Sequence, residues 1–296
     1  MTLGAAFRVI RQGVALVWLA VAQWQRLAEA GKGRGEPTPP PCRLRYLWQA
    51  WDGSGMTATQ QNFVARQQSG AGDELRRLLV PQGRAQSAVR HEVVLRRGAA
   101  GESLLLLQHG WAVARGPKQN GRSAILRIYL PGDVIGLADL GLALVQQDVV
   151  MLTEGSLHVV PKTAVAGLAR HNPRLWPLLL AMSNAEVSAM QTRAILFDRA
   201  TAEDRLIHLL LDIRGRLAVE GIGDGNRFPL PMNQTEIGEA TGMTGIYVNR
   251  LIGKLVRDRQ IEVQRPYVRL LERANFENRM EAIDLTPAMD VGWALR

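Results

Sequence analysis

The amino-acid sequence predicts an α+β protein in which an antiparallel β-barrel or jelly roll is followed by a long helix and a winged helix-turn-helix. Three observations lead to this expectation. Residues 91–160 hold many short apolar runs separated by turns, residues 173–199 repeat apolar side chains at helical spacing, and residues 231–271 carry a helix-turn-helix pattern followed by two strand patterns. A chain of 296 residues is long enough for about two domains, each with its own core.

The amino-acid composition excludes several classes of protein and of metal or disulfide site. Hydrophobic residues make up 47% of the chain and charged residues 21%, which excludes a disordered or low-complexity chain. The single cysteine, Cys42, excludes a disulfide framework, a cysteine-rich zinc site and a cysteine-ligated iron–sulfur cluster. The net charge of +9 divides into +4 over residues 1–55, +5 over 56–227 and zero over 228–296. The total alone therefore does not identify a nucleic-acid or membrane partner.

Residues 1–55 form an uncharacterised extension. The apolar run over 13–22, preceded by Arg8 and Arg11, resembles a signal peptide but is shorter than the roughly 20 residues that a membrane span needs. Three interpretations stay open: a segment outside the functional protein, which would start at Met56; a helix that packs on the rest of the protein; and an export signal or membrane anchor. We favour the first.

The barrel is predicted from short apolar runs and the turns between them. A short amphipathic helix is expected first, over residues 73–80. Many short strands joined by glycine-containing turns are typical of an antiparallel barrel or jelly roll. The expected strands are 92–95, 103–107, 111–114, 124–130, 134–137, 149–152 and 156–160, with turns that include Gly98, Gly110, Gly121, Gly132 and Gly155.

Two helices are predicted after the barrel. The first begins after Pro173 and is too long and too apolar to lie alone on a small barrel, so it is either a core helix or a partner helix in a dimer. The second spans about 201–219, with Thr201 as its cap and Glu203 and Asp204 in an acidic first turn. A glycine-rich loop over 220–226 ends it.

The most informative stretch is residues 231–255. Asn233 or Thr235 can cap a short helix, Gly242 supplies a tight turn, and Thr244 can cap a second helix. This is the helix-turn-helix pattern, whose second helix enters the major groove of DNA. Its apolar residues Val248, Leu251, Ile252 and Leu255 pack inward and leave four predicted base-contacting residues outward: Gly245, Ile246, Asn249 and Arg250. Arginine suits guanine and asparagine suits adenine.

A wing is predicted after the second helix. Residues 257–271 indicate two strands around the pair Arg265-Pro266, and residues 249–273 hold seven basic residues against three acidic ones. This local excess suits phosphate contacts, which position a protein on double-stranded DNA without reading its sequence. The alternative is a helix-turn-helix used only for packing. The predicted phosphate-contacting residues are Thr235, Thr244, Lys254, Arg257, Arg265 and Arg269.

Residues 75–273 resemble the Crp/Fnr family of bacterial transcription regulators. The resemblance rests on the segments 97–104, 110–112 and 130–136, the long helix, and the helix-turn-helix that ends at Val248-Asn249-Arg250. It implies a cyclic-nucleotide-binding-like sensor domain over 56–172, a dimerisation helix over 173–199, a winged helix-turn-helix over 200–275 and a tail over 276–296. It also implies a homodimer in the cytoplasm, with operator DNA and RNA polymerase as partners and no association with a membrane. The 241 residues from Met56 onward are a usual length for the family, which supports that start.

The expected effector site departs from the family pattern. Members that bind cyclic AMP carry a Gly-Glu pair and an Arg-Ser after the Pro-Gly-Asp turn. In this chain, residues 136–142 follow that turn and contain no glutamate. No Lys or Arg lies between Arg127 and Lys162, and a buried phosphate without a cation is costly. We expect an effector other than cyclic AMP, or none, with Asp139 only near the glutamate position. The five histidines lack metal-ligand spacing, so no cofactor or metal is expected.

The recognition helix departs as well. Ile246 stands near the position where many relatives carry a glutamate that reads cytosine, which implies a changed operator. Two alternatives are open: Ile246 touches a thymine methyl group, or it packs on the wing.

A competing function is a membrane-tethered sensor or interaction module anchored by residues 13–22. The sequence shows no phosphate loop, no nucleophile–histidine signature and no metal spacing, so we expect no enzyme.

Overall fold

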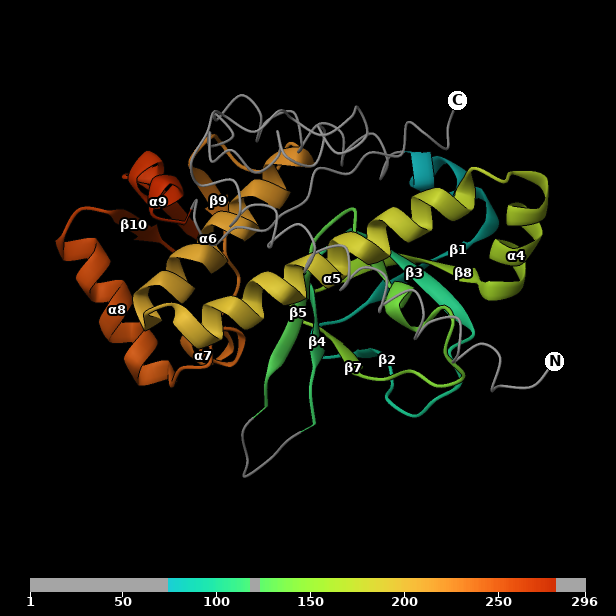
Figure 1. Cartoon of the computed structure of the whole chain (residues 1–296), viewed down its shortest axis with the longest axis horizontal. Helices are drawn as coiled ribbons and strands as arrows, with labels where there is room; N and C mark the ends of the chain where they lie inside the picture. The colour runs from blue at the N-terminus through green and yellow to red at the C-terminus, as the bar shows by residue number, and fades with distance from the viewer. Residues whose placement is uncertain (1–73, 118–122, 281–296) are drawn as a thin grey trace, which may run out of the picture. The chain divides into compact units, whose positions relative to one another are not determined.

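A computed structural model of the chain describes residues 74–117 and 123–280 (Figure 1). These residues belong to one compact unit, Met56–Arg296. The extension 1–55 and its apolar run lie outside the described residues, so the three interpretations of that segment stay predictions. Within the described ranges, no helix is long and apolar enough to cross a membrane.

The N-terminal part is built from two four-stranded antiparallel sheets. One has the strand order β1-β8-β3-β6 and the other the order β2-β7-β4-β5, which confirms the predicted antiparallel barrel. A helix over 74–79 and the 3-10 turn η1 (Val80–Gln82) precede them, and η2 (Leu137–Asp139) follows β6. The strands are β1 (Arg84–Ala88), β2 (Val93–Leu95), β3 (Ser103–His109), β4 (Ala112–Arg115), β5 (Ile125–Tyr129), β6 (Val134–Ile135), β7 (Asp148–Met151) and β8 (Gly155–Pro161).

The continuous apolar run in β3 reflects burial on both faces of its sheet. Alternate side chains of a strand point to opposite faces. Leu105 and Leu107 therefore pack with Ala112 and Met151 of the other sheet, inside the barrel. Leu104 and Leu106 pack outward against residues of the flanking helices, namely Leu75, Leu79, Val165, Ala169, Leu175 and Leu179. The first sheet is thus a central layer between the second sheet and the helices.

Two helices follow the barrel. The helix α4 (Lys162–His171) directly continues β8, and α5 (Leu175–Arg199) is the long helix predicted over 173–199. Figure 1 shows α5 running from the barrel to the helix-turn-helix. One face of α5 is buried against the barrel, whereas an opposite stripe of large apolar side chains is exposed.

The C-terminal part is a winged helix-turn-helix. It consists of α6 (Ala202–Val219), β9 (Arg227–Pro229), α7 (Gln234–Thr241), α8 (Gly245–Arg257), β10 (Ile261–Gln264), β11 (Tyr267–Leu270) and α9 (Arg273–Met280). The predicted wing is confirmed, since β10 and β11 pair around 265–266, and β9 adds a third strand to this sheet. Phe276 and Met280 of α9 are buried in the same core as α6. The tail predicted to begin at residue 276 therefore starts inside a helix of this domain.

Arginine side chains link the barrel to the helix-turn-helix. Arg193 of α5 donates to the backbone carbonyls of Ile125 (2.8 Å) and Leu126 in β5 and to that of Ala240 (3.0 Å) in α7. Apolar residues of the barrel surface, among them Trp111, share one buried cluster with α6 and α7. Three ion pairs also cross between the two parts: Arg115 with Glu239, Arg216 with Asp133, and Arg76 with Glu220.

Candidate nucleic-acid interface

The start of α7 is fixed by a reciprocal cap. The side chain of Asn233 accepts from the backbone N–H of Glu236 at 2.9 Å, and the Glu236 carboxylate accepts from the backbone N–H of Asn233 at 2.8 Å. Two backbone donors that the helix leaves unpaired are thereby satisfied. Of the two caps that the sequence allowed, the structure selects Asn233 and leaves Thr235 exposed in the first turn.

The turn between α7 and α8 depends on two glycines. Gly242 adopts φ +70°, a left-handed conformation that glycine adopts without strain. A Cβ at Gly238 would lie 2.5 Å from the backbone oxygen of Met243, so only glycine permits this approach of the two helices. The hydroxyl of Thr244 then accepts from the N–H of Tyr247 at 3.3 Å and caps α8. These contacts fix the direction in which α8 leaves the turn.

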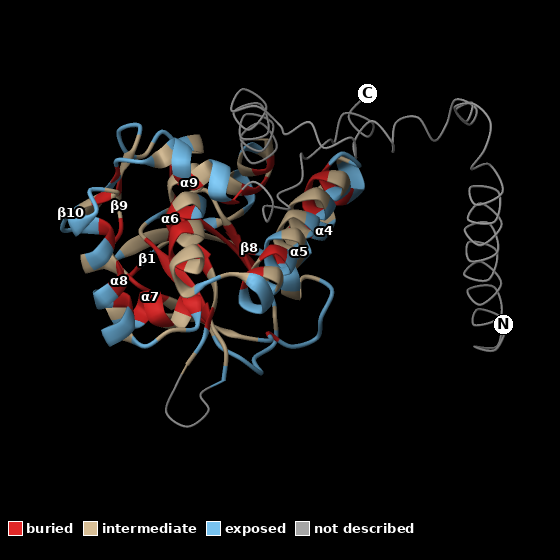
Figure 2. Ribbon diagram, turned by 60° about the vertical axis from the view of Figure 1, so that its left-hand side comes forward, coloured by how far each residue is buried: buried red, intermediate tan, exposed pale blue. Residues whose placement is uncertain are grey.

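The apolar face of α8 packs inward and its polar face is open. Val248, Leu251 and Leu255 are buried, whereas Asn249 and Arg250 are exposed. Figure 2 shows exposed segments along the ribbon of α8. Ile246 is 80% exposed, so the alternative that it packs on the wing is wrong. The fourth predicted base-contacting residue, Gly245, is half-buried, and a Cβ added there would lie 3.2 Å from the hydroxyl of Thr235 in α7.

Tyr247 is a surface residue of α8 that the sequence patterns did not single out. Its side chain is 39% exposed in the first turn of the helix, next to Ile246. A phenol at that place offers a hydroxyl donor beside the predicted base-contacting residues. The amphipathic pattern of the helix was the signal that could have indicated an exposed Tyr247. An aromatic residue in such a pattern is, however, more often part of a core.

The predicted phosphate-contacting cations divide into two groups. Arg257, at the end of α8, and Arg265 and Arg269, on the wing, are exposed and have no partner among the described residues. Lys254 is different: its ammonium donates to the Glu203 carboxylate at 2.6 Å. Three of the predicted cations are thus available to a ligand and one is paired within the domain.

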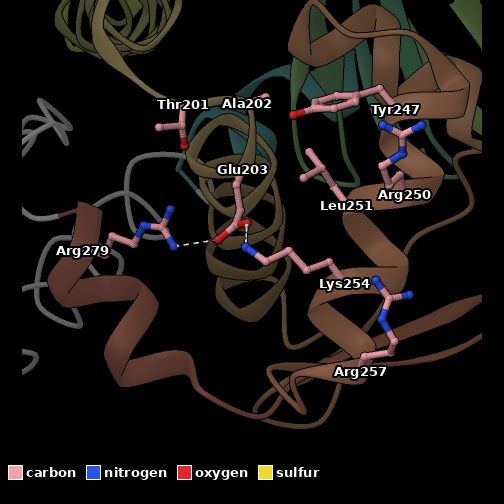
Figure 3. Close-up of a pocket in the computed structure, with 9 residues that line it drawn as sticks. All are labelled: Thr201, Ala202, Glu203, Tyr247, Arg250, Leu251, Lys254, Arg257 and Arg279. Atoms are coloured by element: carbon pink, nitrogen blue, oxygen red, sulfur yellow. Dashed lines mark hydrogen bonds and ion pairs between the residues drawn. The ribbon is translucent and has the colours of Figure 1, made fainter.

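A groove of about 620 Å³ separates α8 from the start of α6 (Figure 3). Arg250, Lys254 and Arg257 line it from α8, and Arg279 lines it from α9. Glu203 also lines the groove and accepts from Lys254 and, at 3.0 Å, from Arg279. The hydrogen bond from Lys254 is the largest influence that lowers the pKa of Glu203, so this carboxylate is charged at neutral pH. No sequence pattern indicates this pairing, because 51 residues separate Glu203 from Lys254.

Lys162 and Arg127, the cations that flank the stretch 128–161 without Lys or Arg, are held in contacts within the protein. The ammonium of Lys162 donates to the backbone oxygen of Asp139 at 2.9 Å, and so binds the loop that follows β6. Arg127 forms an ion pair of 3.2 Å with Glu186 of α5 and lies over the Tyr129 ring. Among the described residues, no group of three or more histidine, cysteine, aspartate or glutamate side chains could hold a metal ion.

Family comparisons match both parts of the chain. Residues 85–172 match the cyclic nucleotide-binding domain, and residues 204–279 match the Crp-like helix-turn-helix domain. Similar curated proteins include the transcriptional activator protein FnrA of Stutzerimonas stutzeri, 23% identical over 64% of this chain and 77% of the relative. The anaerobic regulatory protein of Haemophilus influenzae is 23% identical over 60% of this chain and 69% of the relative.

Solved structures share the fold. FixK2 from Bradyrhizobium japonicum has a TM-score of 0.61 and 21% identity, covering 70% of this chain and 99% of FixK2. A CRP family transcriptional regulator from Thermus thermophilus has a TM-score of 0.55 and 21% identity, covering 69% of this chain and 100% of that regulator. A barrel of the cyclic nucleotide-binding type, a long helix and a Crp-like helix-turn-helix follow one another in this chain. The chain therefore belongs to the Crp/Fnr family of DNA-binding transcription regulators.

Proposed function

We propose that the protein acts as a homodimer that reads a two-fold operator through α8. The observation that carries this proposal is the open face of α8, where Ile246, Asn249 and Arg250 are exposed on a helix whose opposite face is buried. Arg250 has no partner among the described residues, so its guanidinium is free to bind a base edge bidentately. Gly245 lies half-buried at the start of the same helix, beside these residues.

The second half of the proposal rests on α5. Five large apolar side chains of this helix are between 48% and 62% exposed: Trp176, Leu180, Val187, Met190 and Phe197. They follow one another at intervals of 4, 7, 3 and 7 residues, which is the heptad spacing of a coiled-coil seam. A second copy of the same helix can cover all five. A two-fold dimer built on this seam predicts two half-sites about one helical turn of DNA apart.

Replacement of Arg250 by alanine tests base reading. We expect specific binding to weaken by about 1–3 kcal/mol and the preference at one operator position to relax, since a bidentate contact is lost. Selection of bound sites from random DNA, followed by titration of the best site, measures both. Arg269→Ala is the matched control, because a phosphate contact on the wing should weaken binding equally on all sequences. An unchanged sequence preference in Arg250→Ala would refute the assignment.

For the barrel, we propose that cyclic AMP is not the effector. Lys162 is held by the backbone of the loop, and Arg127 is held by Glu186, so neither cation is free to meet a cyclic phosphate. Operator affinity should therefore stay within about twofold when cyclic AMP is added, because a phosphate without a cationic partner binds poorly. Fluorescence anisotropy with labelled operator, with and without the nucleotide, measures this. A change of about tenfold or more would contradict the proposal.

The remaining partners follow from operator binding. A regulator that reads operator DNA works where DNA and RNA polymerase are present, so we place the protein in the cytoplasm with RNA polymerase as a partner. Transcription in vitro from a template that carries the selected operator tests this and also gives the sign of regulation.

A further inference from the structure

Glu203 occupies an unusual place in the groove between α6 and α8. Among the residues that line this groove it is the acidic one, and it lies among four cations: Arg250, Lys254, Arg257 and Arg279. Figure 3 shows its carboxylate between the ends of Lys254 and Arg279, with a bond to each. A DNA backbone that approaches α8 therefore meets two cations that already have an anionic partner.

The exposed fractions of these side chains indicate how deep each one lies in the groove. The side chain of Glu203 is 15% exposed, whereas those of Lys254 and Arg279 are 51% and 36% exposed. The carboxylate thus lies at the floor of the groove, and both cations reach solvent above it. Asp204, next in the chain, forms an ion pair with Arg279 at 2.5 Å and also forms the cap of α6 with Thr201.

From this arrangement we infer that Glu203 limits the sequence-independent DNA affinity of the protein by competing with DNA phosphates for Lys254 and Arg279. The inference rests on the proposed function, since it concerns DNA bound at α8. Phosphate contacts carry no sequence information, so a carboxylate that weakens them lowers binding to all DNA. The contacts of Arg250 and Asn249 with bases are left to discriminate between sequences.

The test compares binding of wild-type protein and Glu203→Gln to a random-sequence duplex over a range of salt concentrations. The amide keeps the size of the side chain and removes its charge. Because two exposed ion pairs are lost, we expect the variant to bind about three- to tenfold more tightly near 0.1 M salt. The slope of log affinity against log salt should become steeper by about one, because Lys254 is freed and releases one more counterion, whereas Arg279 keeps its ion pair with Asp204.

Two matched variants isolate the cause. Glu277→Gln removes a carboxylate that pairs with Arg214 and Arg273 in the same domain but does not line the groove. It changes the net charge equally and should produce a clearly smaller gain. In a Lys254→Gln background, adding Glu203→Gln should produce much less gain than in the wild type, because the cation that the substitution frees is missing. Thermal unfolding of each variant confirms that the domain is folded before binding is compared.

The outcomes separate the inference from the proposed function. A wild-type protein that binds no duplex overturns the proposed function. If the wild type binds, the inference is overturned by an unchanged salt slope in Glu203→Gln, by weaker binding, or by an equal gain in Glu277→Gln. Weaker binding would mean that Glu203 positions Lys254 for DNA. An equal gain would mean that only net charge acts.

Discussion

Replacement of Met190 by glutamate should convert the proposed dimer into monomers and lower operator affinity by about 100-fold or more. Met190 is 62% exposed at the centre of the apolar stripe of α5, and a charge there would face its own copy across the seam. A monomer binds one half-site only, and loses the gain that comes from linking two binding modules. Sedimentation or light scattering measures the oligomeric state, and anisotropy with labelled operator measures the affinity.

Two variants control this experiment. Met190→Leu keeps the apolar contact and should remain dimeric with unchanged operator affinity. Ala189→Glu places the same charge one residue earlier, at an exposed position outside the stripe, and should also remain dimeric. If Met190→Glu stays a dimer, α5 does not form the seam. If Ala189→Glu dissociates as well, the charge acts through helix stability and not through a specific face.

Replacement of Leu255 by alanine should lower the free energy of unfolding by about 2–5 kcal/mol. Leu255 is fully buried where α8 meets the shared core of α6, α7 and the wing. Truncation removes buried apolar surface and leaves a cavity beneath the helix that carries the predicted base-contacting residues. Chemical denaturation followed by circular dichroism measures the loss.

The neighbouring Val256 provides the control for that prediction. It is 41% exposed and lies outside the buried face of α8, so Val256→Ala should change the free energy of unfolding by about 0.5 kcal/mol or less. Equal losses in the two variants would show that α8 is not docked on the face described above.

Local chemistry made much of the DNA-binding region predictable. Gly242 and Thr244 suit the turn and the cap that the structure shows, so the end of α7 and the start of α8 were predicted from the sequence, whereas the cap of α7 was left open between Asn233 and Thr235. The apolar spacing of α8 then determined which residues are exposed. The contacts of these residues with bases and phosphates stay predictions, because they depend on the operator as much as on the protein.

Elements stabilised by distant partners were not predictable. The strand β1 has the sequence Arg-Ala-Gln-Ser-Ala, which lacks β-branched and aromatic residues, and it forms because β8 offers a free edge for pairing. The helix α4 buries only Val165 and Ala169, too few positions for a helical pattern to stand out. The link between Glu203 and Lys254 likewise arises only when α6 and α8 are brought together by the fold.

The guanidinium of Arg193 has a mechanical consequence within the chain. It donates to carbonyls of the barrel strand β5 and of the helix α7, so one rigid planar group is attached to both. Hydrogen bonds of this kind weaken steeply when stretched or tilted, and a small displacement of β5 relative to Arg193 therefore strains or breaks the contact that also holds α7. Motion in the barrel thus has a route to the helix-turn-helix within one chain.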